Sequence, residues 1–351
     1  MILLRQLGYV LHLLWPSLIN VMKLFTTKVP AYILILTILL AGSILLYREL
    51  HPVKVIEKIE SKNNCDIQLI RSTNFKYIKP LIFAERINEY DGFDNIKQTL
   101  NQYIDLEKSK GSIKSASIYV REFEQGRWFV VNPNEKFSPG SMMKIASLLC
   151  YLKESENNPD LLFKKIQFKA HFSEIPQQKI VTGNLVTGRY YSIKELIEAM
   201  IIDSNNDATM LLNTMMNYKI YFDLLSSLNL SIPGDNQSDY PLTTTECSKM
   251  MRIIFNSSYL NPKNSEYAMD LLTKSKFHDG LAKLIPDNVT IAHKFGERFN
   301  PVEQQLHETA IIYSGNKPYL LTVMTRGDDQ EKLKTVLNSI SKTVYDFMIL
   351  K

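Results

Sequence analysis

A serine and a lysine one helical turn apart are the residues of this sequence whose spacing suggests catalysis. Ser141 and Lys144 lie in the segment SPGSMMK, where proline and glycine before an apolar run predict the start of a helix. Residues three apart share a helical face, so Lys144 is expected beside Ser141. A serine hydroxyl becomes nucleophilic when a base takes its proton, and a lysine whose pKa is lowered by burial can be that base. The N–H of Ser141 would also be available to a developing oxyanion.

Two further polar segments contain residue types that suit the same chemistry. In DSNNDA, a short polar loop between two apolar stretches can present Ser204 and Asn206 to a cleft. In IAHKFGE, Lys294 would supply positive charge, Gly296 would let a substrate backbone approach an edge strand, and the N–H of Glu297 would be a second oxyanion donor. Taken singly, these two segments are more typical of a capped loop and an ordinary strand, and the Ser-x-x-Lys spacing recurs near the C-terminus without such context.

The three segments together resemble the three motifs of class A β-lactamases and penicillin-binding proteins. Ser-x-x-Lys is followed by Ser-x-Asn 63 residues later and by Lys-x-Gly 90 residues after that. The resemblance covers roughly residues 93–351. It implies a serine hydrolase without a cofactor, with an α/β sheet beside an all-helical lobe and the site between them.

Carried over residue by residue, the resemblance assigns a role to each polar side chain. Ser141 would be acylated, and Lys144 would act in proton transfer. Ser204 would relay a proton to the leaving nitrogen, and Asn206 would bind the amide side chain of the substrate. Lys294 would add electrostatic stabilisation. No metal is expected.

Three departures from the family pattern bear on activity. Asn205 stands where the family usually has aspartate. Phe295 replaces the threonine or serine whose hydroxyl binds a substrate carboxylate; we expect it to add bulk near the cleft and to remove a bond worth roughly 1.5–3 kcal/mol. The loop before Thr243-Thr244-Thr245 holds Asp235 and Asp239 but no glutamate to activate water, so the acyl-enzyme is expected to persist.

The departures leave two functions open. One is a serine hydrolase or acyltransferase that acts on a peptide or ester of the cell envelope, or on a β-lactam. The other is a catalytically idle protein that keeps this fold and serves as a binding or scaffold module. Acylation of Ser141 distinguishes them.

Hydrophobic periodicity predicts the elements that must hold these residues. Period-two alternation brackets a turn at Gln125-Gly126, and ETAIIYSGNKPYLLTVMTRG reads as two strands joined by a turn. Helical patterns occupy residues 93–109, much of 141–275, and 328–350. Strands at both ends with helices between them predict an α/β fold (α+β), in which one antiparallel sheet is assembled from both ends of the domain.

The N-terminal region predicts a membrane anchor. Residues 30–47 form an uncharged segment that is just long enough to cross a bilayer core, and lysines precede this segment. We therefore expect a cytoplasmic or interfacial segment (1–28), a transmembrane anchor (29–47), an extracytoplasmic stalk (48–91) and the hydrolase domain (92–351). A cleaved signal peptide and a translation start at Met22 remain alternatives.

Composition narrows the classes of partner. The formal net charge of +5 is spread over 351 residues without a dense basic block, so no nucleic-acid partner is expected. The three cysteines form no CxxC pair, and no HExxH is present, which argues against a zinc site. No serine lies in a Gly-x-Ser-x-Gly elbow, which disfavours a Ser-His-Asp hydrolase of that kind.

Overall fold

The protein is known from a computed structural model that describes residues 67–72, 77–172, 180, 183–230, 241–299, 303–315 and 317–350. All of these residues belong to one compact unit, Lys58–Lys351. The predicted anchor and the segment before it lie outside the described residues. Within the described ranges, no helix combines the length and the apolar character needed to cross a membrane.

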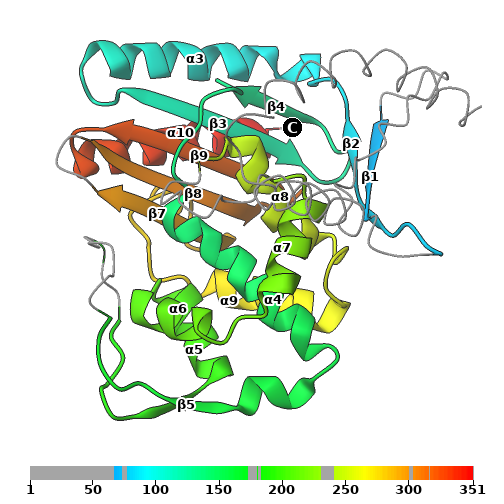
Figure 1. Cartoon of the computed structure of the whole chain (residues 1–351). Coiled ribbons are helices and arrows are strands. Elements are labelled where there is room, and N and C mark those ends of the chain that lie inside the picture. The colour runs from blue at the N-terminus through cyan, green and yellow to red at the C-terminus, as the bar shows by residue number, and fades with distance from the viewer. Residues whose placement is uncertain are drawn as a thin grey trace, which may run out of the picture. The chain divides into compact units, whose positions relative to one another are not determined.

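A five-stranded antiparallel sheet forms the centre of the described chain, in the order β4-β3-β9-β8-β7 (Figure 1). Its strands are β3 (Ser115–Glu122), β4 (Trp128–Val131), β7 (Thr290–Phe299), β8 (Gln304–Tyr313) and β9 (Tyr319–Gly327). Strands from the two ends of the domain meet where β3 pairs with β9. The prediction of one sheet built from both ends is therefore confirmed.

Two helices cover one face of this sheet. They are α3 (Asp94–Ser109), which follows the short 3-10 turn η1 (Asp91–Phe93), and α10 (Gln330–Ile349). Both contact the sheet and each other. Apolar residues of α3, α10 and the facing strands form a continuous buried core. Both helices lie where the sequence pattern predicts them, because each carries an apolar stripe at helical spacing.

The other face of the sheet meets a lobe made mainly of helices, with α8 lying directly on β3, β8 and β9. The helices are α4 (Lys144–Ser155), α5 (Ile193–Ile202), α6 (Asn206–Asn213), α7 (Tyr218–Ser227), α8 (Thr244–Phe255) and α9 (Pro262–Thr273). Shorter elements in this part are η2 (Gly140–Met143), η3 (Pro159–Phe163), β5 (Lys165–Gln167) and β6 (Tyr190–Ser192). The helices and the sheet share a second core.

Local capping explains where two of these helices begin. Ser192 and Glu195 form a capping box at the start of α5. Thr243 and Glu246 form another at the start of α8. In each box the side chains satisfy backbone N–H groups that have no partner within the helix, which fixes the entry of the chain.

The segment predicted to be a stalk contributes a hairpin to the domain. Strands β1 (Ile67–Arg71) and β2 (Leu81–Arg86) pair with each other as a separate two-stranded sheet. Glu85 on β2 forms ion pairs with Arg121 of β3, at 2.5 Å, and with Arg252 of α8. Arg121 belongs to the sheet, and Arg252 is a fully buried residue of the helical lobe. This carboxylate therefore joins the hairpin to both lobes of the domain.

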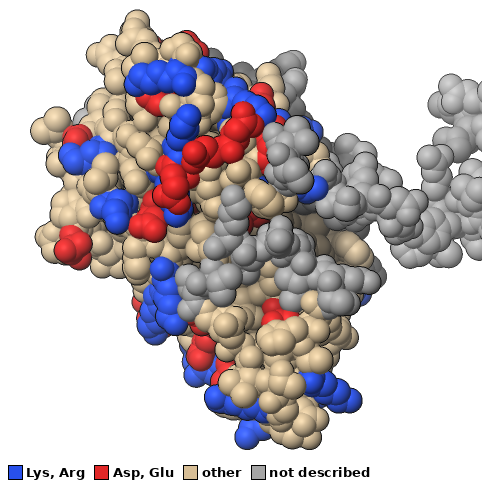
Figure 2. All heavy atoms as spheres, turned by 90° about the vertical axis from the view of Figure 1, so that its left-hand side faces the viewer, with Lys and Arg blue, Asp and Glu red and all other residues tan. Residues whose placement is uncertain are grey.

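On the face shown in Figure 2, basic and acidic side chains lie interspersed among uncharged ones. Several ion pairs between described residues follow helical spacing, such as Lys342 with Asp346 on α10. Such pairs balance charge locally on the surface and contribute little to stability.

Candidate active site

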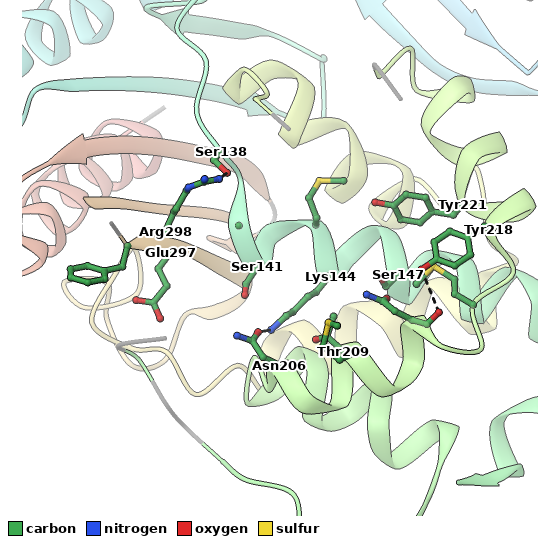
Figure 3. Close-up of a pocket in the computed structure, with 16 residues that line it drawn as sticks. Ser138, Ser141, Lys144, Ser147, Asn206, Thr209, Tyr218, Tyr221, Glu297 and Arg298 are labelled. Carbon is green, nitrogen blue, oxygen red and sulfur yellow. Dashed lines mark hydrogen bonds between the residues drawn. The ribbon is translucent and has the colours of Figure 1, made fainter. Parts of the chain in front are cut away.

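Ser141 lies in the single turn η2, immediately before α4, and its side chain faces a cavity (Figure 3). The helix start predicted from the proline and glycine is therefore present, with its first turn in 3-10 form. Lys144 begins α4 one turn later and lines the same cavity. The predicted closeness of Ser141 and Lys144 therefore follows from the geometry of one helical turn.

Strand β7 passes directly over this turn because glycine occurs on both sides of the contact. A Cβ on Gly296 would lie 2.1 Å from the carbonyl oxygen of Pro139, and one on Gly140 would lie 2.6 Å from the carbonyl oxygen of Glu297. Neither position could hold a larger residue without displacing backbone, and Gly140 also has a positive φ of 54°. Gly296 therefore lets the protein's own turn approach β7, which differs from the predicted approach of a substrate.

The same approach brings the backbone of Glu297 beside the turn that carries Ser141. The Cβ position on Gly140 lies 3.2 Å from the Glu297 nitrogen. An N–H from each of the two segments is the arrangement that acyl-transfer sites use for an oxyanion. The Glu297 carboxylate accepts hydrogen bonds from the Ile180 N–H at 3.0 Å and from Gln330 at 2.8 Å.

Lys144 is almost completely buried, and its amine is held by the polar loop between α5 and α6. The Nζ atom donates to the Ser204 carbonyl oxygen at 2.5 Å and to Asn206 Oδ1 at 2.7 Å. Burial and the nearby charge of Lys294 hold the pKa of Lys144 well below its usual value. A neutral amine has two N–H bonds, which these two acceptors can satisfy, so its lone pair would remain available to accept a proton.

Lys294 approaches the same loop from β7. Its Nζ donates to Ser204 Oγ at 2.8 Å and to the carbonyl oxygen of Phe295 at 3.0 Å. The Ser204 hydroxyl also lies 3.3 Å from Lys144 Nζ and so bridges the two lysines. Complete burial lowers the pKa of Lys294 to about 7, although Glu308 and Glu297 oppose the shift. Lys294 can therefore change protonation state near neutral pH.

The loop itself is held in an unusual backbone conformation. Ser204 has a φ of 51°, which a residue with a side chain adopts only at an energetic cost. Asn205 caps α6 by accepting the Ala208 N–H at 2.7 Å, and it donates to the Gly183 carbonyl oxygen at 2.8 Å. An aspartate could cap the helix but could not donate to Gly183. The asparagine at this position therefore keeps the loop in place.

The prediction that Phe295 adds bulk near the cleft is wrong. Phe295 packs in the core that the sheet shares with α3 and α10, and the Lys294 Nζ atom lies 4.3 Å from the centroid of its ring. Its ring is 1% exposed and lies 4.4 Å, between centroids, from that of Phe277. The side chain of Phe295 therefore does not obstruct the cavity.

His307 on β8 supports the segment that leads into Ser141. Its Nδ1 accepts the Thr325 N–H at 3.1 Å, so the ring proton is on Nε2, which lies 3.0 Å from the Ser138 carbonyl oxygen and donates to it. Burial lowers the pKa of His307 to about 3, and the imidazole is therefore neutral at physiological pH. The sequence pattern could not give this role, because the partners lie in separate parts of the chain.

The cavity has a volume of about 620 Å³, which suits a small ligand. Around the nucleophile it is lined by Ser138, Gly140, Ser141, Lys144, Glu297 and Arg298. Arg298 donates to Ser138 Oγ at 2.9 Å. Arg298 and Ser138 were not among the predicted site residues, although Arg298 directly follows the Lys-x-Gly-Glu segment. Ser204 and Lys294 lie beneath this surface and reach the cavity through Lys144.

The sequence matches the beta-lactamase enzyme family over residues 95–348. The chain belongs to this family.

Solved structures of the same fold resemble this beta-lactamase family member at low sequence identity. TLA-1 extended-spectrum beta-lactamase has a TM-score of 0.64 and 18% identity, over 74% of this chain and 100% of that one. A beta-lactamase from Sphaerobacter thermophilus has a TM-score of 0.63 and 15% identity, over 72% and 97%. A PBP-A variant in an acyl-enzyme complex with penicillin-G has a TM-score of 0.59 and 15% identity, over 72% and 96%. No curated protein matches the sequence.

These likenesses confirm the predicted α/β β-lactamase-like fold for this beta-lactamase family member. They do not assign catalytic roles to residues of this chain, because the sequence identity is low. The loop with Asp235 and Asp239, where the sequence lacks a glutamate, lies outside the described residues.

Proposed function

We propose that this family member is a membrane-anchored serine hydrolase or acyltransferase that acts outside the cytoplasm, through an acyl-enzyme on Ser141. Its substrate would be a peptide or an ester of the cell envelope, or a β-lactam. The observation that carries this proposal is the environment of the Lys144 amine. The amine lies at the cavity wall beside Ser141 with a lowered pKa and two carbonyl acceptors.

In the first step, the neutral Lys144 amine takes the proton of Ser141 while Oγ attacks the carbonyl carbon of the substrate. The Ser141 and Glu297 N–H groups stabilise the resulting oxyanion. When the bond to the leaving group breaks, the proton must return from Lys144 to the leaving atom, and Ser204 Oγ, 3.3 Å from Lys144 Nζ, would relay it once its hydroxyl turns toward the cavity. The positive charge of Lys294 beside that hydroxyl favours the transfer.

In the second step, water or an acceptor nucleophile must attack the acyl-enzyme, and we propose that this step is slow. Among the described residues that line the cavity, Glu297 is the single carboxylate. Both of its oxygens accept hydrogen bonds, from Ile180 and from Gln330. These two bonds hold the carboxylate toward Ile180 and Gln330, and we propose that it does not act as the base for water.

The deciding experiment is mass spectrometry of the full-length chain after incubation with a fluorescent penicillin. We expect a stable adduct on Ser141 that is absent in Ser141→Ala and in Lys144→Ala. Ser155→Ala is a matched control, because Ser155 lies at the far end of α4 and donates to the Leu152 carbonyl oxygen. This variant is expected to form the adduct.

Absence of an adduct from penicillin, from simple esters and from thioesters would contradict the proposal. The protein would then be the second candidate, a binding or scaffold module with this fold. Rapid turnover of penicillin without an accumulated adduct would preserve the nucleophile but contradict slow deacylation.

A further inference from the structure

The cavity continues well beyond the nucleophile, along a groove between α4 and α6 (Figure 3). We call this extension the acyl arm. It is lined by Ser147, Met210, Asn213, Met216, Tyr218 and Tyr221. Ser147 lies six residues after Ser141, so the arm follows the α4 axis for on the order of 9 Å. Figure 3 shows Tyr218 and Tyr221 at the end of the arm farthest from Ser141.

The periodicity of α6 explains why this groove is continuous. Asn206, Met210 and Asn213 are spaced by four and three residues, so they lie on one face of α6. Asn206 at the start of this face contacts Lys144, and Asn213 lies about two turns farther along. The groove therefore begins at the reacting residues and is a continuation of their site.

The walls of the acyl arm suit an uncharged, apolar group. Two methionines and two tyrosines supply most of its large side chains, and methionine adapts to irregular apolar shapes. Among the described residues that line the cavity, the charged ones are Lys144, Glu297 and Arg298, all at the nucleophile end. A charged group in the arm would lose hydration without gaining an ionic partner, whereas an alkyl chain would be stabilised by burial.

We infer that the acyl arm binds the acyl group of the substrate, and that this group is a medium-length alkyl chain. The inference rests on the proposed acylation of Ser141. The departing group must take up a proton, and Lys144, Ser204 and Lys294 supply it at the other end of the cavity. The retained acyl group then occupies the uncharged arm.

The experiment uses p-nitrophenyl acetate, butyrate and octanoate with the full-length chain. In each reaction the Ser141 Oγ–carbonyl carbon bond forms and the bond to the p-nitrophenolate oxygen breaks. The serine proton passes to Lys144, and p-nitrophenolate is released and measured. Burial of each methylene predicts a gain of about fourfold in the second-order rate constant of acylation. We therefore expect a rise on the order of 100-fold from butyrate to octanoate, with an octanoyl adduct on Ser141.

Two comparisons make the result specific to the acyl arm. Met210→Asp places a carboxylate in the arm and is expected to reduce the octanoate-to-acetate rate ratio to near one. Val186→Asp makes the same kind of change at a side chain that is 61% exposed and does not line the cavity, so the ratio should be retained. In a second series, thioacetates of ethanethiol and octanethiol vary the leaving group alone, and their rates are expected to be similar.

The outcomes separate this inference from the proposed function. Acylation of Ser141 at equal rates by acetate and octanoate would overturn the acyl-arm inference and leave the nucleophile established. A chain-length preference confined to the thiol series would also overturn it, because the arm would then hold the leaving group. If no donor acylates Ser141, the proposed function fails instead. The wild-type series suffices for these decisions even if Met210→Asp does not fold.

Discussion

Lys144 and Ser204 are 60 residues apart in the chain, yet the Lys144 Nζ atom lies 2.5 Å from the carbonyl oxygen of Ser204 and 3.3 Å from its Oγ. This contact joins α4 to the loop between α5 and α6. It directs both the carbonyl group and the hydroxyl of one serine toward the proposed base. The consequences for activity and stability can be measured.

The first prediction concerns whether Lys144 acts as a base or only as a positive charge. Arginine keeps the charge but remains protonated at all accessible pH values. We expect Lys144→Arg and Lys144→Met to reduce the Ser141 acylation rate by a similar factor, on the order of 10²–10⁴. Stopped-flow measurement with a p-nitrophenyl ester tests this. A rate near wild type for Lys144→Arg would mean that charge, and not proton transfer, is required.

The second prediction concerns pH. Lys144 must be neutral to accept the serine proton, so acylation should rise with pH, in a range well below the usual lysine pKa. Lys294 has a pKa of about 7 and should lose its stabilising charge above that value, which produces a falling limb. A pH–rate profile of single-turnover acylation measures both limbs.

A Lys294→Gln variant provides the control for that profile. Removing a like charge raises the pKa of Lys144, so the rising limb should move to higher pH and the falling limb near pH 7 should disappear. A falling limb that survives this substitution would have to be assigned to another group.

The third prediction concerns the backbone of Ser204. Glycine adopts a positive φ without steric cost, whereas alanine keeps the strain that serine has there. We expect Ser204→Gly to be more stable to denaturant than Ser204→Ala by about 1 kcal/mol. Both variants lack the hydroxyl and should acylate slowly to the same extent. Equal stabilities would show that the loop relaxes when the hydroxyl is removed.

The fourth prediction concerns His307. In His307→Phe, the Ser138 carbonyl oxygen and the Thr325 N–H lose their partner, which should lower the free energy of unfolding by about 1–3 kcal/mol. Acylation should also slow, because Ser138 leads into the nucleophile turn. Denaturant unfolding and ester kinetics measure the two effects.

The pH dependence of stability has a definite sign at His307. Its pKa in the folded protein, about 3, is below the ordinary value of 6.5. The unfolded chain therefore binds a proton first as pH falls, and the folded protein loses stability between about pH 6.5 and pH 3. His307→Phe should lose less stability over this range. An unchanged slope would show that other groups cause the acid sensitivity.

Much of the secondary structure could be predicted because its signals are local. The capping box of Ser192 and Glu195 spans three residues, and the β8–β9 hairpin shows its alternation and its turn within one short segment. The closeness of Ser141 and Lys144 is likewise a property of one helical turn. Such features depend on backbone geometry over a few residues, and the sequence contains that information directly.

The hairpin of β1 and β2 shows why other parts could not be predicted. Its polar composition resembles a stalk, and its place in the domain depends on Glu85 meeting Arg121 and Arg252 from two distant elements. No local pattern encodes a contact between residues so far apart in sequence.

The sequence alone therefore determined the helix start at Ser141, the β8–β9 hairpin, and the three motifs that resemble the family. The tertiary structure alone decided that Phe295 faces the far core and that Gly296 accommodates the turn at Pro139. It also decided that Lys144 and Lys294 meet at one hydroxyl. The physical reason is that periodicity fixes which side chains share a face, whereas packing between distant elements fixes what each face contacts and whether a buried lysine keeps its proton.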